Sequence, residues 1–253
     1  MLNVVHTPST STGRPLVIAH GLYGSARNWG VIARSLSDRG PVMAVDHRNH
    51  GQSPWQDTHR YEDLAGDLAR IIEANADGAV DLLGHSMGGK AAMMLALTRP
   101  DLVSRLIVAD IAPVAYAHSQ IEYIKTMQAI DLSEQPARAE VQKQLQARLN
   151  DAMLASFFSQ SYDPAKGAWR LNLDVLARDM PAILGFPDTG ASYPGPTLFL
   201  SGGLSDYVMP THRPVMKRLF PAALFLKIPG AGHWLHAEKP AEFTAAVRHW
   251  LDR

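Results

Sequence analysis

Six residues, Gly84 to Gly89 (Gly-His-Ser-Met-Gly-Gly), restrict the possible folds of this chain more than any other segment. They join a short apolar run, Val80 to Leu83, to an amphipathic stretch, Met87 to Thr98, so the pattern predicts a strand, a sharp turn and a helix. Glycines two positions before and after Ser86 let this strand and helix pass close to each other. The turn then presents the Ser86 hydroxyl at the carboxyl end of a strand.

The rest of the chain alternates short apolar runs with segments of helical periodicity. The predicted buried strands are Leu16 to Ala19, Val42 to Val45, Val80 to Leu83, Leu106 to Ala109, Thr197 to Leu200 and Leu224 to Ile228. Amphipathic stretches between and after them include Trp29 to Leu36, Tyr61 to Ala74, Met87 to Thr98 and Glu242 to Leu251. Continuously apolar strands that alternate with helices are typical of a mostly parallel sheet covered on both faces. We therefore expect an α/β protein with a doubly wound sheet.

The alternation stops between Pro113 and Pro196. This segment contains helical patterns but no pattern typical of a strand, and the helical patterns are Ile121 to Ile130, Ala137 to Phe158 and Leu171 to Met180. A structureless loop of this length is improbable in a compact domain. We predict that residues 113–195 form a helical cap over the carboxyl edge of the sheet, inserted into a core of residues 1–112 and 196–253.

Composition excludes several classes of function. The 24 Lys and Arg residues balance the 24 Asp and Glu residues, so no net positive field is present to bind nucleic acid. The absence of cysteine excludes disulfides, thiolate nucleophiles and cysteine-bound metals. Because the first residues show no basic segment followed by a long apolar run, we expect no secretory signal and a cytoplasmic location. Every apolar run is far shorter than the roughly 18 residues of a membrane span, so we expect no span.

Serine chemistry needs partner residues, because a serine hydroxyl is a weak nucleophile without an adjacent base that a carboxylate orients. His233 lies in a glycine-rich loop between the last apolar run and the C-terminal helix, and is the best-placed base. Two acids compete for the third position. Asp110 and Asp206 both follow predicted strands at their carboxyl ends, where catalytic residues collect in parallel sheets. The pattern by itself leaves this choice open.

A tetrahedral intermediate also needs hydrogen-bond donors for its oxyanion. The backbone N–H of Met87, directly after Ser86, is the first candidate. The segment His20 to Gly24 follows the run Leu16 to Ala19, and its Leu22 N–H is the second candidate.

Taken together, four motifs resemble those of the α/β-hydrolase superfamily over nearly the whole chain. They are His20-Gly21, Asp46 to Ser53, Gly84 to Gly89, and Gly232-His233 with Glu238 and Pro240. Other segments are most similar to the YbfF- and ABHD11-like subfamily of acyl esterases and thioesterases; these are Arg48 to Gly51, Lys90, Asp110 to Val114 and Gly202 to Val208. The resemblance implies an α/β-hydrolase fold with a cap between the family's sixth and seventh strands.

The same resemblance implies a serine esterase that uses Ser86 and His233, with Leu22 and Met87 as oxyanion donors. The subfamily pattern maps its acid onto Asp110 and brings Ser205 near the histidine. The wider superfamily usually has its acid after the next strand, where Ser205 fills one alignment of the position and Asp206 follows it. We favour Asp110, because the subfamily match is the closer one.

The expected substrate is a small-molecule acyl ester or thioester, acyl-CoA included. The residues expected to bind it are His20, Gly21, Tyr23, His85, Ser205 and Trp234. Flexible and aromatic cap residues suit an apolar acyl pocket, namely Met127, Met153, Phe157, Phe158, Trp169, Met180 and Phe186. Basic cap residues are either contacts for acyl-CoA phosphates or a solvated helix face, and they are Lys125, Arg138, Lys143 and Arg170.

Other functions remain open at this level. A perhydrolase or a C–C bond hydrolase would use the same triad, and a non-catalytic ligand receptor would share the fold. We expect no metal, because His47 and His50 have no further ligands in their pattern, and no cofactor. The chain is expected to be a monomer or a homodimer.

Overall fold

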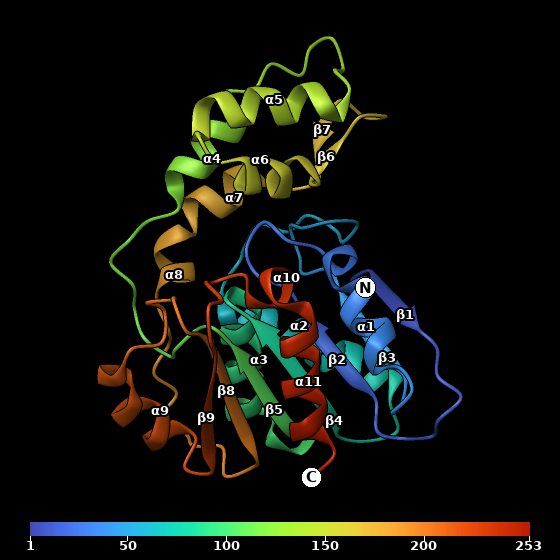
Figure 1. Cartoon of the computed structure of the whole chain (residues 1–253), viewed down its shortest axis with the longest axis vertical. Helices are drawn as coiled ribbons and strands as arrows, with labels where there is room; N and C mark the ends of the chain where they lie inside the picture. The colour runs from blue at the N-terminus through green and yellow to red at the C-terminus, as the bar shows by residue number, and fades with distance from the viewer.

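The computed structural model describes residues 1–253, and Figure 1 shows a sheet flanked by helices, with a second group of helices above it. The sheet has seven strands in the order β1-β3-β2-β4-β5-β8-β9. Their bounds are β1 (Val4–Thr7), β2 (Leu16–Ala19), β3 (Val42–Val45), β4 (Val80–His85), β5 (Val103–Ala109), β8 (Thr197–Gly202) and β9 (Ala223–Ile228). Only β1 pairs antiparallel with its neighbour, so the predicted mostly parallel α/β sheet is confirmed.

Helices cover both faces of this sheet. Those on one face are α1 (Gly30–Leu36) and α11 (Pro240–Leu251), and those on the other are α2 (Tyr61–Asn75), α3 (Met87–Thr98) and α9 (Arg213–Leu219). Successive side chains of a strand point to opposite faces, so Val17 packs in one core and Ile18 in the other. Burial on both faces explains why the strands are continuously apolar. Short helical turns complete this part: η1 (Ala26–Trp29), η2 (Pro100–Leu102), η3 (Pro210–His212) and α10 (Leu235–Glu238).

Two features of the sheet differ from the sequence prediction. Strand β1 was not predicted, because its four residues are partly exposed and carry no clear apolar run. Strand β9 was expected to be buried but lies at the edge of the sheet. Leu224 and Leu226 on this strand are 46% and 45% exposed, whereas Ile228 on the same face is buried, so the edge strand is only partly covered.

The segment between β5 and β8 is mainly helical and lies beyond the sheet in Figure 1. We call it the cap. Its elements are α4 (Ile121–Gln128), α5 (Arg138–Leu149), α6 (Ala152–Ser159), β6 (Tyr162–Asp163), β7 (Ala168–Trp169), α7 (Leu173–Arg178) and α8 (Met180–Leu184). No helix of the molecule combines the length and the apolar composition that a membrane span requires.

The cap also corrects the sequence prediction in detail. The pattern from Ala137 to Phe158 is two helices, because Asn150 has a φ of 51° that ends α5 and the Asp151 carboxylate accepts the N–H groups of Met153 and Leu154 in the first turn of α6. The two-residue strands β6 and β7 form an antiparallel ladder where no strand was expected. Strands this short leave no periodic signal in a sequence.

Candidate active site

Ser86 occupies the sharp turn between β4 and α3, with φ 52° and ψ −121°. The backbone of a non-glycine residue is strained at positive φ, and tight packing on both sides of the turn maintains that conformation. A Cβ on Gly84 would lie 2.2 Å from the Gly88 carbonyl oxygen, and one on Gly88 would lie 2.3 Å from the Ala19 carbonyl oxygen. Only glycine fits either position, which accounts for the spacing of the motif.

His233 connects Ser86 to Asp110. Its Nε2 lies 3.1 Å from the Ser86 Oγ, and its Nδ1 lies 2.8 Å from the Asp110 Oδ2. The loop that carries His233 is held by Glu238, whose carboxylate accepts the N–H groups of Gly232 and Trp234 at 2.7 and 3.2 Å. A serine, an imidazole and a carboxylate are thus joined by hydrogen bonds in the order that activation of a serine requires.

Asp110, rather than Asp206, contacts the histidine. Asp110 follows β5 directly with a φ of 51° and is fully buried. Its Oδ1 accepts the Gly202 N–H at 2.9 Å, and its Oδ2 accepts the Ser205 hydroxyl at 2.5 Å as well as the His233 imidazole. Asp206 is exposed to solvent and has no hydrogen bond to His233.

Ser205 was expected to bind substrate, and its position corrects that expectation. The hydroxyl points at Asp110 behind the imidazole, and Ser205 does not line the cavity in front of Ser86. A buried carboxylate needs hydrogen-bond donors for its lone pairs, and Ser205 supplies one of them. Its effect on a substrate would therefore pass through Asp110 and His233.

The segment from His20 to Gly24 lies directly against Ser86. A Cβ on Gly21 would come within 3.2 Å of the Ser86 Cβ and 2.8 Å of the His85 Nδ1, so a larger residue there would displace the segment. The Leu22 N–H donates to no acceptor within the chain. Met87 is the first residue of α3, where helical N–H groups lack helical acceptors. Both predicted oxyanion donors are therefore available to a ligand.

Two neutral imidazoles orient the Leu22 N–H. The Nε2 of His20 accepts the His47 N–H, so its Nδ1 carries the proton and donates to the Gly21 carbonyl at 2.8 Å. The Gly21 carbonyl and the Leu22 N–H belong to one planar peptide group, so holding the carbonyl in place also sets the direction of the N–H. His50 accepts the Tyr23 N–H at 3.2 Å on the other side of Leu22. Burial lowers the pKa of His20 and brings the pKa of His50 to about 3, which keeps both rings neutral.

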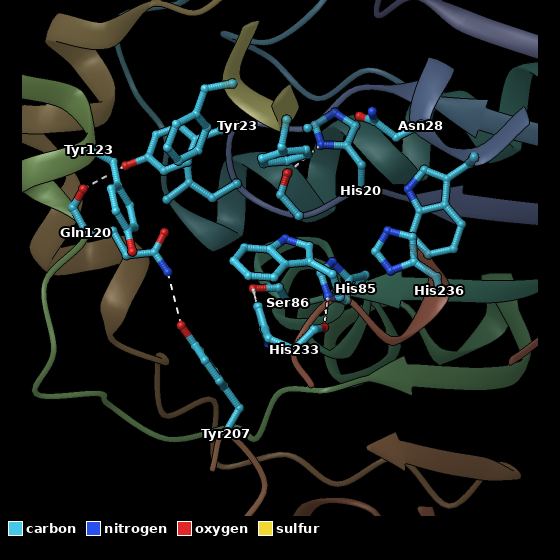
Figure 2. A pocket seen from close by; sticks show the side chains of 17 residues that line it. His20, Tyr23, Asn28, His85, Ser86, Gln120, Tyr123, Tyr207, His233 and His236 are labelled. Carbon is cyan, nitrogen blue, oxygen red and sulfur yellow. Dashed lines mark hydrogen bonds between the residues drawn. The ribbon is translucent and has the colours of Figure 1, made fainter. Parts of the chain in front are cut away.

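A cavity of about 160 Å³ opens above Ser86, and Figure 2 shows the side chains around it. Of the expected substrate-binding residues, five line this cavity: His20, Gly21, Tyr23, His85 and Trp234. The sequence analysis missed other lining residues, among them Asn28, Trp29, Gln120, Tyr123, Tyr207 and His236. The Tyr207 ring stacks on His233, with centroids 3.9 Å apart and planes 19° apart. The only signal for Tyr207 in the sequence is its position directly after Ser205 and Asp206.

The cap supplies fewer cavity residues than the sequence suggested. Phe157 and Phe158 line the cavity, whereas Met127 and Met180 are buried in the hydrophobic core. Of the four basic cap residues, Lys125 pairs with Glu122, Arg170 pairs with Asp163, Arg138 donates to the Tyr162 carbonyl, and Lys143 is exposed. None of these four side chains lines the cavity above Ser86.

Two further spaces adjoin the cavity. A groove of about 440 Å³ shares Asn28, Phe157, Trp234 and His236 with it and is lined further by α6 residues such as Met153 and Leu154. A chamber of about 30 Å³ lies on another side of Ser86 and is lined by residues that include Met87, Lys90 and Tyr116. Ser86 thus faces one large and one small compartment. The histidines and carboxylates of the chain form no group suited to hold a metal ion.

Comparisons with known proteins agree with this geometry. The model of the alpha/beta hydrolase fold family matches residues 14–240. The sn-1-specific diacylglycerol lipase ABHD11 of Mus musculus is 42% identical over 246 residues, which is 93% of this chain and 80% of that protein. Esterase YbfF of Escherichia coli is 37% identical over 94% of this chain and 93% of its own.

A solved structure described as a marine microorganism esterase superposes with a TM-score of 0.91 at 38% identity. The superposition covers 99% of this chain and 100% of that one. Fold, motifs and full-length similarity lead to the same assignment. The chain belongs to the α/β-hydrolase fold family, among its esterases and lipases.

Proposed function

We propose that this chain is a serine hydrolase of carboxylic esters with an apolar acyl or alcohol chain, acting through an acyl-enzyme intermediate. One observation carries the proposal. The hydrogen-bonded series Asp110, His233 and Ser86 ends at the base of a cavity whose other walls are largely aromatic and apolar. An apolar pocket with a few convergent polar groups is what an ester substrate needs.

The geometry gives each residue a step. The Ser86 Oγ attacks the ester carbonyl carbon while the His233 Nε2 takes its proton, and Asp110 holds the imidazole in the correct tautomer. The N–H groups of Leu22 and Met87 stabilise the oxyanion. His233 then donates the proton to the leaving alcohol, and the acyl group remains on Ser86. A water molecule, deprotonated by His233, attacks the acyl-enzyme. The bond between the acyl carbon and the Ser86 Oγ then breaks, His233 returns the proton to Oγ, and the acid is released.

The spaces around Ser86 support esters with one long substituent. The main cavity continues into the outer groove past Phe157 and Trp234, so an extended chain has an apolar path to the surface. The small chamber beside Met87 suits the shorter side of the ester. Because the mouse relative is a diacylglycerol lipase, a glycerol ester is the natural lipid to test. Thioesters are chemically compatible with the same site.

The first experiment is a rate series with p-nitrophenyl esters from acetate to palmitate, extended to a diacylglycerol and to the matching acyl-CoA. Ser86→Ala is the control, because it removes only the nucleophile. We expect turnover by the wild type to disappear in Ser86→Ala, with a preferred chain longer than acetate. The diacylglycerol and acyl-CoA arms compare oxygen esters with thioesters.

Several outcomes would contradict the proposal. Equal rates for wild type and Ser86→Ala would exclude a serine mechanism. If no ester or thioester were hydrolysed, assays of peroxide-dependent perhydrolysis and of C–C bond cleavage would test the other reactions compatible with the triad. Tight binding of an ester without turnover would indicate a receptor.

A further inference from the structure

Lys90 is a buried lysine that the proposed mechanism does not use. It lies in the first turn of α3, and its own N–H donates to the Ser86 carbonyl at 3.0 Å. Only 1% of the residue is exposed to solvent. Burying an ammonium group costs free energy unless its hydrogens make hydrogen bonds. The hydrogen-bond partners of Lys90 therefore indicate what this residue does.

The Nζ of Lys90 donates to three backbone carbonyls and to no carboxylate. The acceptors are the carbonyl oxygens of Val114 at 2.9 Å, Leu184 at 2.8 Å and Gly185 at 2.7 Å. Burial lowers the pKa of Lys90 to about 7, whereas three carbonyl acceptors match the three hydrogens of the ammonium form and favour it. Val114 lies where the chain leaves the sheet for the cap, and Leu184 and Gly185 lie at the end of α8, where the chain leaves the cap.

Neighbouring residues bring the two cap connections to the same point. The Tyr116 N–H of the first connection donates to the Leu184 carbonyl of the second at 3.1 Å. Tyr61, from α2 of the core, donates its hydroxyl to the Ile183 carbonyl at 2.6 Å. The rings of Tyr116 and Tyr61 lie 4.8 and 5.7 Å from the Lys90 Nζ. Aromatic faces and carbonyl dipoles both stabilise a cation in this position.

The same helix therefore carries the catalytic serine at its start and the attachment of the cap one turn later. Carbonyls at the C-terminal end of a helix lack helical partners, and the negative end of the dipole of α8 favours a cation there. An apolar side chain would fill the space around Lys90 but would leave its three contacts to the connections unmade. The ammonium is what joins two segments that are about 70 residues apart in sequence.

We propose that Lys90 is a positioning residue that fastens both cap connections to helix α3 and so sets the place of the cap over Ser86. The expected effect on ester kinetics rests on the proposed ester hydrolysis. The expected effect on the cap connections rests on the hydrogen bonds of Lys90 alone. Short esters need little of the cap, whereas long esters contact Phe157 and Phe158 on it. Release of the connections should therefore affect long substrates selectively.

The test compares wild type with Lys90→Met, which has similar length but no charge and no donors. We expect kcat/KM for the best long-chain ester to fall about tenfold or more, mainly through KM, because a displacement of about 1 Å suffices for losses of this size. The rate on p-nitrophenyl acetate should fall by a clearly smaller factor; Lys90 also lines the small chamber beside Ser86, so a loss common to both esters is a change in that chamber and not in the cap. Amide hydrogen exchange should accelerate in the two connections, residues 112–118 and 183–187, and not in the sheet.

Val247→Ala is the matched control, because it opens a small cavity in the core on the other face of the sheet and lowers stability without touching the cap connections. It should leave both the chain-length preference and the exchange of the connections unchanged. If Lys90→Met does not fold, Lys90→Gln retains two donors and should show a smaller effect of the same kind.

Equal losses on short and long esters, or unchanged exchange in the connections, would overturn the assignment. Hydrogen exchange does not depend on turnover. If the wild type hydrolysed no ester, the proposed function would fail, while the exchange arm would still decide whether Lys90 fastens the cap.

Discussion

The carboxyl edge of the sheet and the cap face each other across the cavity, and different interactions hold them in place. At the sheet edge, Ser86, Asp110 and Tyr23 all have positive φ, and buried imidazoles and close glycines fix the surrounding backbone. The cap contributes walls from ordinary helices, and its two connections meet at Lys90.

This difference separates chemistry from selectivity. Strained backbone and neutral buried imidazoles hold the reacting groups at hydrogen-bond distance from one another. Catalysis requires that precision. Aromatic walls on helices need only shape and apolar surface, so they accept substitution more readily. Changes at the sheet edge should therefore lower rates on every substrate, whereas changes in the cap should redistribute rates among substrates.

The largest expected effect is acid sensitivity of the sheet edge. Burial lowers the pKa of His20, His47, His50, His59 and His85. These rings stay neutral in the fold but take up protons near pH 6.5 when the chain unfolds, so stability is complete above that pH and falls as the pH decreases. Every ring that stays neutral in the fold adds to this loss, so the free energy of unfolding should decrease steeply below pH 6.5. Urea unfolding at pH 7.5, 6 and 5 measures the loss, and a free energy of unfolding that stays constant would contradict it.

Asp110→Asn should have the next largest effect. An amide cannot hold the imidazole in the tautomer that accepts the Ser86 proton, so kcat should fall by about 10⁴ on every ester. Asp206→Asn is the control and should change kcat by less than about twofold, because Asp206 is exposed and has no hydrogen bond to His233. The reverse result would assign the acid to Asp206.

His50→Phe tests the support of the oxyanion donors. The ring is kept, but the nitrogen that accepts the Tyr23 N–H is lost. We expect kcat to fall by about 10- to 100-fold with KM nearly unchanged, because a displaced donor weakens the transition state more than the ground state. Steady-state kinetics on a short and a long ester would show equal losses. A loss confined to long esters would place this residue with the cap in its effect.

Phe157→Ala should have the smallest effect on chemistry and the clearest effect on selectivity. Phe157 lines both the cavity and the outer groove. Removing the ring should raise KM for long esters about tenfold through lost apolar contact, while acetate hydrolysis stays within about twofold. The p-nitrophenyl series measures both values. An equal decrease for all chain lengths would show that the cap wall also supports the reacting groups.

Sequence patterns were sufficient for the fold class, because period and turn chemistry are local properties. The glycine spacing around Ser86, the loop of His233 and the segment from His20 to Gly24 each stand out within a few residues. These three segments were expected to lie together, because the carboxyl ends of parallel strands meet at one edge of the sheet. The structure brings Ser86 and His233 within hydrogen-bond distance at that edge.

The tertiary structure decided which way side chains point and which residues far apart in the sequence are in contact. Strand position alone left Asp110 and Asp206 open and the subfamily resemblance favoured Asp110; the structure shows that Asp110 is buried, has a positive φ and contacts His233. Ser205 serves that acid instead of the cavity. Lys90 reaches carbonyls 24 to 95 positions away along the chain. Backbone carbonyls leave no mark in a sequence, so contacts to them become visible only when the chain is folded.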